Sequence, residues 1–266
     1  MQTFFRNPLA EPFVLGISSG ASLGVALVVL GGSTLLTTNG FRGDLGIAAA
    51  ACVGAVAVLL LVMLVAQRVH SSMTLLVLGV MVGYMTSAAV SLLIYFSRPE
   101  EISAYISWTF GSFGGVTWGT MSVFAPAVLP ALALAFLLAK PLNALLLGET
   151  YAQSMGLNVR RARIGIITVS ALLAGTVTAF CGPISFIGLA APHLGRSLLN
   201  TSDHRLLIPA SALLGATAAL LADLIAQAPA MPNVTLPLNA VTALFGAPVV
   251  IWVILRRHNL RQAFAA

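Results

Sequence analysis

The sequence predicts an all-α protein, a polytopic bundle of about eight transmembrane helices, from two observations. The first is composition: of 266 residues, 59% are hydrophobic and 8% are charged, whereas a soluble domain carries roughly 25% charged residues. The second is that the apolar residues gather in runs close to the ~20 residues that a helix needs to cross a bilayer. We therefore expect a single transmembrane domain over residues 1–266.

Eight apolar segments are predicted to span the membrane, in the order Phe13–Leu36, Leu45–Ala66, Thr74–Phe96, Met121–Leu138, Ile164–Phe180, Ile184–Leu199, Leu206–Ala226 and Leu236–Leu255. The sixth is short and contains Pro192. Glycines and prolines interrupt several of the others. Close helix packing explains most of these glycines, although irregular backbone at membrane depth also suits a transport path.

The basic residues predict the orientation of the chain. Alternate connections fall on the same side of the bilayer, and one side holds only Arg42 and Arg98. The other side holds the remaining eleven of the thirteen Lys and Arg residues, namely Arg6, Arg68, Lys140, Arg160, Arg161, Arg163, Arg196, Arg205, Arg256, Arg257 and Arg261. Cytoplasmic loops carry such an excess, so both termini are predicted to be cytoplasmic. The net charge of +6 then reflects topology and not nucleic-acid binding.

The longest polar interruption, Gly148–Arg163, lies on the predicted cytoplasmic side. Ala152, Met155 and Val159 recur in it at helical spacing, which predicts a short helix with one apolar face. Gly156 stands where a helix caps itself in a left-handed conformation. Another protein can bind a helix at the membrane surface and move it. A solvated loop between two spans is the alternative interpretation.

On the opposite side, Ser97–Trp118 combines Glu100 and Glu101 with several aromatic residues among glycines. This composition predicts an interfacial helix or a re-entrant turn with tryptophans at the level of the lipid headgroups. The alternative is an aromatic belt without a ligand.

Catalytic and metal-binding motifs are absent from the sequence. Lys140, the single lysine, is followed by proline, so a P-loop cannot occur. No HExxH or GxSxG motif is present. The four histidines (His70, His193, His204 and His258) are too scattered for a metal site and are predicted to be interfacial, and Cys52 and Cys181 are predicted to be packed thiols.

Asp223 is the one acidic residue inside a predicted span. An intramembrane carboxylate is a functional candidate because its burial is costly unless it is paired or hydrated. A structural hydrogen bond near the outer end of its helix is the alternative. The sequence thus predicts a polytopic protein without an energy source of its own. The polar cytoplasmic segment implies that a separate protein supplies the energy.

Several motifs resemble one family, the permease subunits of ABC importers for iron-siderophores, haem and cobalamin. They occur in the order of that family, from Arg6 to the end of the chain. They are Arg6–Pro12 with Leu15–Ala21, Gly148–Ala152 with Met155–Leu157, Gly182–Leu189 with Pro192, His193 and Arg196, Asp203–Arg205, and Leu236–Pro237 with Val241–Thr242 and Gly246–Pro248.

The resemblance implies a non-catalytic subunit that binds no cofactor itself. It implies a homodimer in the bacterial inner membrane, two ATPase subunits that bind ATP and Mg²⁺ on the cytoplasmic side, and a periplasmic or lipid-anchored binding protein outside. The segment matching the family's ATPase-coupling helices contributes Glu149, Thr150, Tyr151, Ala152, Ser154, Met155, Gly156, Leu157 and Asn158. Ser71 and Ser72 match a cytoplasmic gate. Pathway-lining helices match Met73–Phe96, the Ser103–Trp118 region, and parts of Ile184–Leu199 and Leu236–Leu255.

The sequence departs from the family in two respects. The resemblance implies a family with ten spans, and this chain is expected to lack the equivalent of the first two. A cobalamin permease of the family has an arginine for binding-protein docking where this chain has Gln227. Arg98, Glu100 and Glu101 are therefore the expected substitutes in docking.

The expected function is that of the permease of an ATP-driven importer for an iron chelate, such as a siderophore, with haem or cobalamin as the other substrate classes. Two alternatives stay open. One is a proton-coupled secondary transporter that uses Asp223, and the other is a membrane scaffold that transports nothing.

Overall fold

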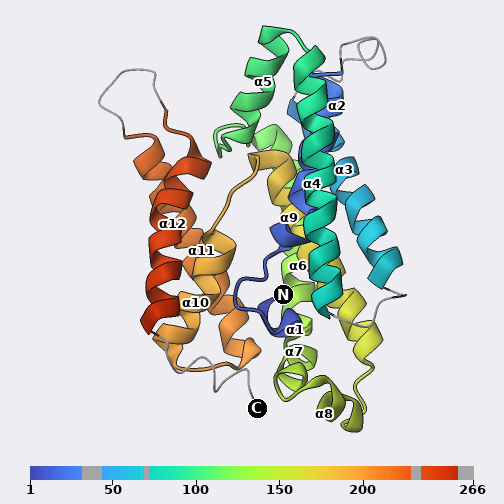
Figure 1. The fold of residues 1–266 in the computed structure, drawn as a ribbon. Coiled ribbons are helices and arrows are strands. Elements are labelled where there is room, and N and C mark those ends of the chain that lie inside the picture. Colours follow the sequence, from blue (N-terminus) through green and yellow to red (C-terminus); the bar gives the residue numbers. More distant parts are fainter. Residues whose placement is uncertain (32–43, 67, 69–71, 229–234, 257–266) are drawn as a thin grey trace. The chain divides into compact units, whose positions relative to one another are not determined.

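The structure, a computed structural model, describes residues 1–266 except 32–43, 67, 69–71, 229–234 and 257–266 (Figure 1). Contacts group the chain into two compact units. Unit 1 consists of Met1–Glu11, Leu132–Ile166 and Ile184–Ala266, and unit 2 consists of Pro12–Ala131 and Ile167–Pro183. The expectation of one domain over residues 1–266 stays a prediction.

Helices make up both units in the described part of the chain. Unit 2 contains the 3₁₀ turn η1 (Pro12–Leu15) and the helices α2 (Ile17–Val29), α3 (Asp44–Ala66), α4 (Ser72–Phe96) and α5 (Pro99–Thr109), with most of α6 (Trp118–Leu137) and α9 (Val159–Cys181). Unit 1 contains α1 (Gln2–Phe5), α7 (Ala139–Leu146), α8 (Glu149–Ser154), α10 (Ile187–Leu199), α11 (His204–Ala226) and α12 (Leu238–Arg256).

Each of the eight predicted segments contains one helix, but the helices differ in length. Among the described residues, α3, α4, α6, α9 and α11 are long and apolar enough to cross a membrane. In contrast, α2 and α10 have 13 residues each. The prediction that the first segment is helical from Phe13 is wrong at its start. There the chain forms η1 and then turns at Gly16, whose φ of 77° is left-handed, so α2 begins only at Ile17.

The contact between α2 and α3 forms the centre of unit 2, and it depends on glycine. A Cβ atom added to Gly54 would lie 2.1 Å from the carbonyl oxygen of Gly20, and one added to Gly24 would lie 2.1 Å from that of Ala50. The two backbones therefore touch without intervening side chains, as small residues allow in membrane helices. Gly175 of α9 joins the same region, because its Cβ would lie 3.1 Å from Cβ of Ala55.

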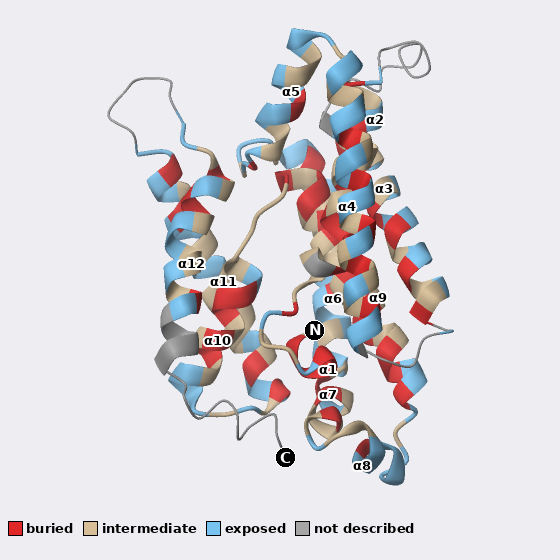
Figure 2. Ribbon diagram, viewed as in Figure 1, coloured by how far each residue is buried: buried red, intermediate tan, exposed pale blue. Residues whose placement is uncertain are grey.

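Much of the helical surface is exposed (Figure 2), and many large apolar side chains lie on it. Trp118, Phe96 and Leu213 are largely exposed in the isolated chain. Exposed apolar area of this extent on a soluble monomer would mark an interface or an aggregation site. On helices of membrane-spanning length it is the surface that lipid or another membrane chain covers.

Within unit 1, α10 packs against α11 and α12, again at small residues. Gly195 approaches Leu207, and Gly246 approaches the ring of Phe186 so closely that a Cβ there would lie 2.5 Å from Cβ of Phe186. The backbone is left-handed at both ends of α10, at Phe186 and at Asn200. The sixth predicted segment is therefore a short helix with defined ends, and it contains Pro192.

Candidate functional site

The predicted coupling segment, Glu149–Asn158, lies in unit 1 and forms the short helix α8. Helix α7 precedes it, and Leu147 and Gly148 separate the two helices. On α7, Ala139, Leu142 and Leu145 are buried, and this apolar face fixes the helix on its unit. Gly148 makes the turn into α8 with a φ of 109°. A Cβ at Gly148 would lie 3.1 Å from Nη2 of Arg6, so both the backbone angle and the neighbouring guanidinium favour glycine there.

Helix α8 leaves most of its side chains on the surface. Ala152 is fully buried, whereas Tyr151 is 56% exposed and Met155, just after the helix, is 52% exposed. Thr150, Gln153 and Ser154 are exposed as well. Tyrosine and methionine are enriched where proteins bind one another. The segment therefore has the composition of a contact surface for another chain.

The predicted apolar face of this segment is wrong in one respect. The spacing placed Ala152, Met155 and Val159 on one face, and Ala152 and Val159 are buried. Met155 is exposed because α8 ends at Ser154 and α9 starts anew at Val159. Helical periodicity does not continue across the turn between them.

The turn after α8 has the predicted cap. Gly156 is left-handed with a φ of 85°, and the N–H of Leu157 donates to the carbonyl of Ala152 at 3.0 Å. This is the six-to-one bond of a Schellman ending. Asn158 then caps α9, where its Oδ1 accepts from the N–H of Arg161 at 3.0 Å. The left-handed cap at Gly156 is confirmed, and the surface segment is held at both ends.

Arg163 on α9 extends back to both neighbouring helices. Its guanidinium carbon lies 5.5 Å from the centre of the Phe4 ring on α1, within the range of a cation–π contact. Its Nη2 also lies 3.9 Å from Oε1 of Glu149, the first residue of α8. Because Arg163 is buried, the contact with Phe4 is largely shielded from water.

A second polar group lies at the start of α11 and consists of Thr3, Asn143, Asp203 and His204. Oδ1 of Asn143 lies 2.7 Å from Nδ1 of His204 and accepts the backbone N–H of His204 at 2.9 Å. Nδ2 of Asn143 donates to Asp203 at 2.5 Å. Nε2 of His204 lies 2.8 Å from Oγ1 of Thr3.

These four residues join α1, α7 and α11, and sequence reasoning did not identify them as a group. His204 and His193 were predicted to be interfacial, which stays a prediction, and both are buried within unit 1. Nε2 of His193 donates to the carbonyl oxygen of Pro8 at 3.0 Å. The sequence signal for His204 was its place next to Asp203, a residue type that caps helices, but the partners Asn143 and Thr3 are remote in the chain.

The predicted docking residues occupy both units. In unit 2, α5 confirms the predicted helix in Ser97–Trp118, and Arg98 precedes it with its N–H donating to Oε2 of Glu101 at 3.2 Å. Glu100 is exposed in the first turn. In unit 1, Nε2 of Gln227 donates to Oδ2 of Asp223 at 2.6 Å. The carboxylate of Asp223 therefore has the structural hydrogen bond that was one of its two interpretations.

The predicted gate falls at the edge of the described chain. Ser71 lies outside the described residues, and Ser72 is the first residue of α4. Nothing in the structure bears on their role.

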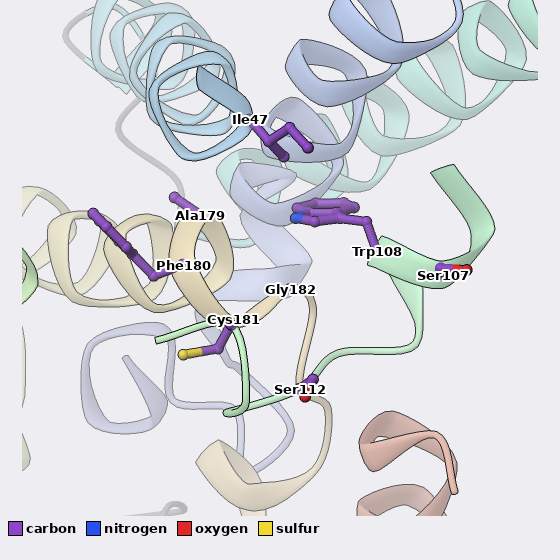
Figure 3. A pocket seen from close by; sticks show the side chains of 9 residues that line it. Ile47, Ser107, Trp108, Ser112, Ala179, Phe180, Cys181 and Gly182 are labelled. Atoms are coloured by element: carbon purple, nitrogen blue, oxygen red, sulfur yellow. The ribbon is translucent and has the colours of Figure 1, made fainter. Parts of the chain in front are cut away.

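A small cavity of about 130 Å³ lies in unit 2 beside the end of α9, with Trp108, Ser112 and Cys181 among its lining residues (Figure 3). The N–H of Ser112 donates to the carbonyl of Cys181 at 2.9 Å. Gly182 follows with a left-handed φ of 74°, and a Cβ there would lie 2.6 Å from the carbonyl oxygen of Trp108. Pockets for drug-sized ligands measure roughly 300–1,000 Å³, so this cavity is too small for a large chelate.

Among the described residues, no three His, Cys, Asp or Glu side chains cluster in a way that could hold a metal ion. In unit 1, outside the apolar helices, burial raises the pKa of the Glu11 carboxyl group to about 7.

Three comparisons with known proteins agree with one another. The model of the FecCD transport family matches residues 1–256. The hemin transport system permease protein HmuU of Yersinia pestis is 36% identical over 263 residues, which are 98% of this chain and 77% of that protein. The vitamin B12 import system permease protein BtuC of Salmonella arizonae is 40% identical over 256 residues, 96% of this chain and 75% of that protein.

A solved structure also superposes on this fold. It is described as an inward-facing conformation of a metal-chelate type ABC transporter, and it matches with a TM-score of 0.85 and 30% sequence identity. The match covers 96% of this chain and 79% of the other.

Proposed function

Because the chain belongs to the FecCD transport family, we propose that it is the permease subunit of an ATP-driven importer for an iron chelate. It moves the substrate by alternating access and hydrolyses no ATP itself. The observation that carries the proposal within the structure is the α8 surface, where Tyr151 and Met155 are exposed on a segment held at both ends.

The α8 surface is the proposed contact for a separate ATPase. An ATPase that drives transport through this surface needs a segment that moves as a rigid body and does not unfold. The cap at Gly156 and the buried Ala152 supply that stiffness. We assign Glu149–Asn158 to the coupling contact, with two ATPase subunits on a homodimer of this chain. ATP and Mg²⁺ bind in those partners.

The orientation proposed from the basic residues puts α8 and both termini in the cytoplasm, with the chain in the inner membrane. A periplasmic or lipid-anchored binding protein then docks on the other side. Arg98, Glu100, Glu101 and Gln227 are the proposed docking residues. They are polar side chains at helix ends, namely the start of α5 and the end of α11.

The substrate class is a large chelate. Relatives of the chain carry the names of hemin and vitamin B12 permeases, and the structural match is a metal-chelate type transporter. A siderophore, haem and cobalamin share a bulky organic ligand around one metal ion. We propose an iron chelate, with iron as cargo and not as a resident cofactor.

The test uses membranes in which the chain is expressed together with the ATPase that co-purifies with it. Tyr151→Ala truncates an exposed side chain, so it leaves the fold of the chain intact and is expected to lower ATP hydrolysis by the complex at least about fivefold. Charge reversal at Glu149 is expected to lower it as well, although Arg163 lies nearby. The control is Leu220→Ala, which truncates an exposed side chain on α11.

Unchanged ATP hydrolysis in both α8 variants would contradict the coupling role. Uptake into vesicles that requires a proton gradient and no ATPase would favour the alternative of a secondary transporter, for which Asp223 is the candidate. The hydrogen bond from Gln227 to Asp223 gives that carboxylate a structural role and argues against this alternative. A chain that neither transports nor binds an ATPase would be the scaffold.

A further inference from the structure

We infer that His204 is a positioning residue that joins the coupling surface to α11, so that α7, α8 and the start of α11 move together. The inference rests on the proposed function, because it concerns how a push on α8 reaches a membrane helix. It is carried by the contacts of His204 with α1 and α7, and by a second set of contacts that leads from α8 back to α1.

The hydrogen bonds around Asn143 determine which atoms donate. An ionised carboxylate only accepts hydrogen bonds, so the group of Asn143 that faces Asp203 is its NH₂. Oδ1 of Asn143 therefore faces His204 and accepts both the backbone N–H and Nδ1–H of that residue. With the hydrogen on Nδ1, Nε2 is the acceptor for the hydroxyl of Thr3. Every polar atom of the imidazole then has a partner.

Burial makes these bonds costly to lose. His204 is 6% exposed and Thr3 is 7% exposed. A buried polar atom that loses its partner bears its full desolvation cost, which exceeds the net gain from an ordinary hydrogen bond. The bonds therefore hold α1 and α7 against the first turn of α11 more firmly than surface contacts would.

The contacts form a closed ring within unit 1. From His204, Asn143 leads along α7 to α8, and only two residues separate these helices. In the other direction, Thr3 leads to its neighbour Phe4 on α1. The guanidinium of Arg163 lies over Phe4 and reaches Glu149 of α8. A displacement of α8 thus reaches α11 by two routes that meet at His204.

The ring predicts a specific defect when His204 is replaced. An ATPase can still bind α8, because the exposed side chains of α8 are unchanged. The movement of α8 is then absorbed by local shifts of α7 and α1, and less of it reaches α11. ATP is consumed with less transport per molecule hydrolysed.

Three variants separate the two routes. His204→Phe removes both side-chain bonds and keeps a planar ring. His204→Asn keeps an amide nitrogen close to the position of Nδ1, so it preserves the link to Asn143 and loses Thr3. Thr3→Val removes only the hydroxyl that bonds Nε2. Arg205→Gln, an exposed neighbour on the same helix, is the matched control.

The first measurement needs no partner. Hydrogen exchange of the full chain in detergent is expected to be at least about fivefold faster at α7 and α8 in His204→Phe, because both buried side-chain hydrogen bonds of His204 are lost. It is expected to be intermediate in His204→Asn and Thr3→Val, and unchanged in Arg205→Gln. Equal exchange in wild type and His204→Phe would overturn the inference whatever the chain transports.

The second measurement is the ratio of uptake to ATP hydrolysis in vesicles holding the chain, its co-purifying ATPase and binding protein, with hemin and cyanocobalamin as probes. The ratio is expected to fall about fivefold in His204→Phe and to recover in part in His204→Asn. A fall in both rates with an unchanged ratio would show a purely structural role and overturn the inference. No ATP-dependent uptake by wild type would instead contradict the proposed function.

Discussion

The α2–α3 contact of unit 2 and the polar ring of unit 1 hold helices together in opposite ways. Between α2 and α3, Gly20 and Gly54 bring the backbones into direct contact, and no side chain lies between them. In the ring, side chains from four helices and the start of a fifth bridge the gaps by hydrogen bonds, one cation–π contact and one ion pair.

The difference determines what each region tolerates. Two backbones in contact have no side chain to rearrange, so any added atom must move a whole helix. A bridge made of side chains can lose one member while the others remain, which costs the energy of that member. The first region therefore suits a fixed scaffold. The second suits a part whose stiffness natural substitutions can adjust in small steps.

The largest expected effect comes from Gly54→Ala, which tests the scaffold directly. The added Cβ would lie 2.1 Å from the carbonyl oxygen of Gly20, so α2 and α3 must separate. We expect a loss of about 3 kcal/mol in the free energy of unfolding, as overpacking of a rigid contact costs. Thermal unfolding of the purified chain in detergent measures it.

Gly83→Ala is the matched control for this prediction, because its Cβ would meet only Oγ of Ser19 at 3.5 Å. That is ordinary contact, and alanine raises helix propensity by up to about 1 kcal/mol. Similar unfolding temperatures for the two variants would show that the α2–α3 interface can yield, and the comparison with unit 1 would fail.

A smaller effect is expected from Glu11→Gln, which changes a carboxyl group of unit 1 outside the ring and gives a measure of what burial of such a group costs there. Glu11 precedes the first apolar helix, and burial raises its pKa to about 7 from 4.5. Between these values the unfolded chain loses the proton and the folded chain keeps it. The stability of the wild type therefore falls as the pH rises from about 4.5 to about 7, and the loss is complete above the pKa of the folded chain. The stability of the Glu11→Gln variant does not fall in this way, because glutamine does not ionise.

The measurement for Glu11 is the unfolding temperature of both proteins at pH 5 and pH 8. The free energy of unfolding of the variant, relative to that of the wild type, is expected to rise by about 1–2 kcal/mol between these pH values, after allowance for the partial exposure of Glu11. Parallel pH profiles for the two proteins would show that Glu11 is ionised in the folded chain at little cost.

The smallest effect is expected from Asp203→Ala. Oδ1 of Asp203 accepts the N–H of Arg205 at 2.9 Å and caps α11, and this bond, more than any other interaction, lowers the pKa of the carboxyl group. Loss of an N-cap costs about 1 kcal/mol. Asp203→Asn keeps an acceptor oxygen and should retain most of the stability. Equal losses of stability in Asp203→Asn and Asp203→Ala would show that the charge of Asp203, and not its capping hydrogen bond, stabilises α11.

Much of the fold follows from local sequence. The apolar runs that predicted spans at Leu45–Ala66 and Thr74–Phe96 match α3 and α4 within two residues, because a long apolar run leaves a chain in lipid few alternatives to a helix. The cap at Gly156 was predictable for a similarly local reason, since a left-handed residue at the end of a helix is usually glycine.

The remaining features depend on partners that are distant in the chain. Met155 fits an apolar helical face by spacing, and only the end of α8 at Ser154 exposes it. His204 reads as a residue of a surface connection, and its burial results from Thr3 and Asn143, which lie 201 and 61 residues away. Likewise, the turn at Gly182 reflects the approach of Trp108. Periodicity carries no information about such pairs.

The segment from Thr150 to Asn158, which includes most of α8 and the turn after it, also forms a compact epitope. Its shape is set by its own caps and by the buried Ala152, so a nanobody raised against the folded chain would recognise a stable form and not a flexible peptide. Such a nanobody would compete with whatever partner covers Tyr151 and Met155. Its binding in native membranes would report directly the fraction of this chain that is free of its partner.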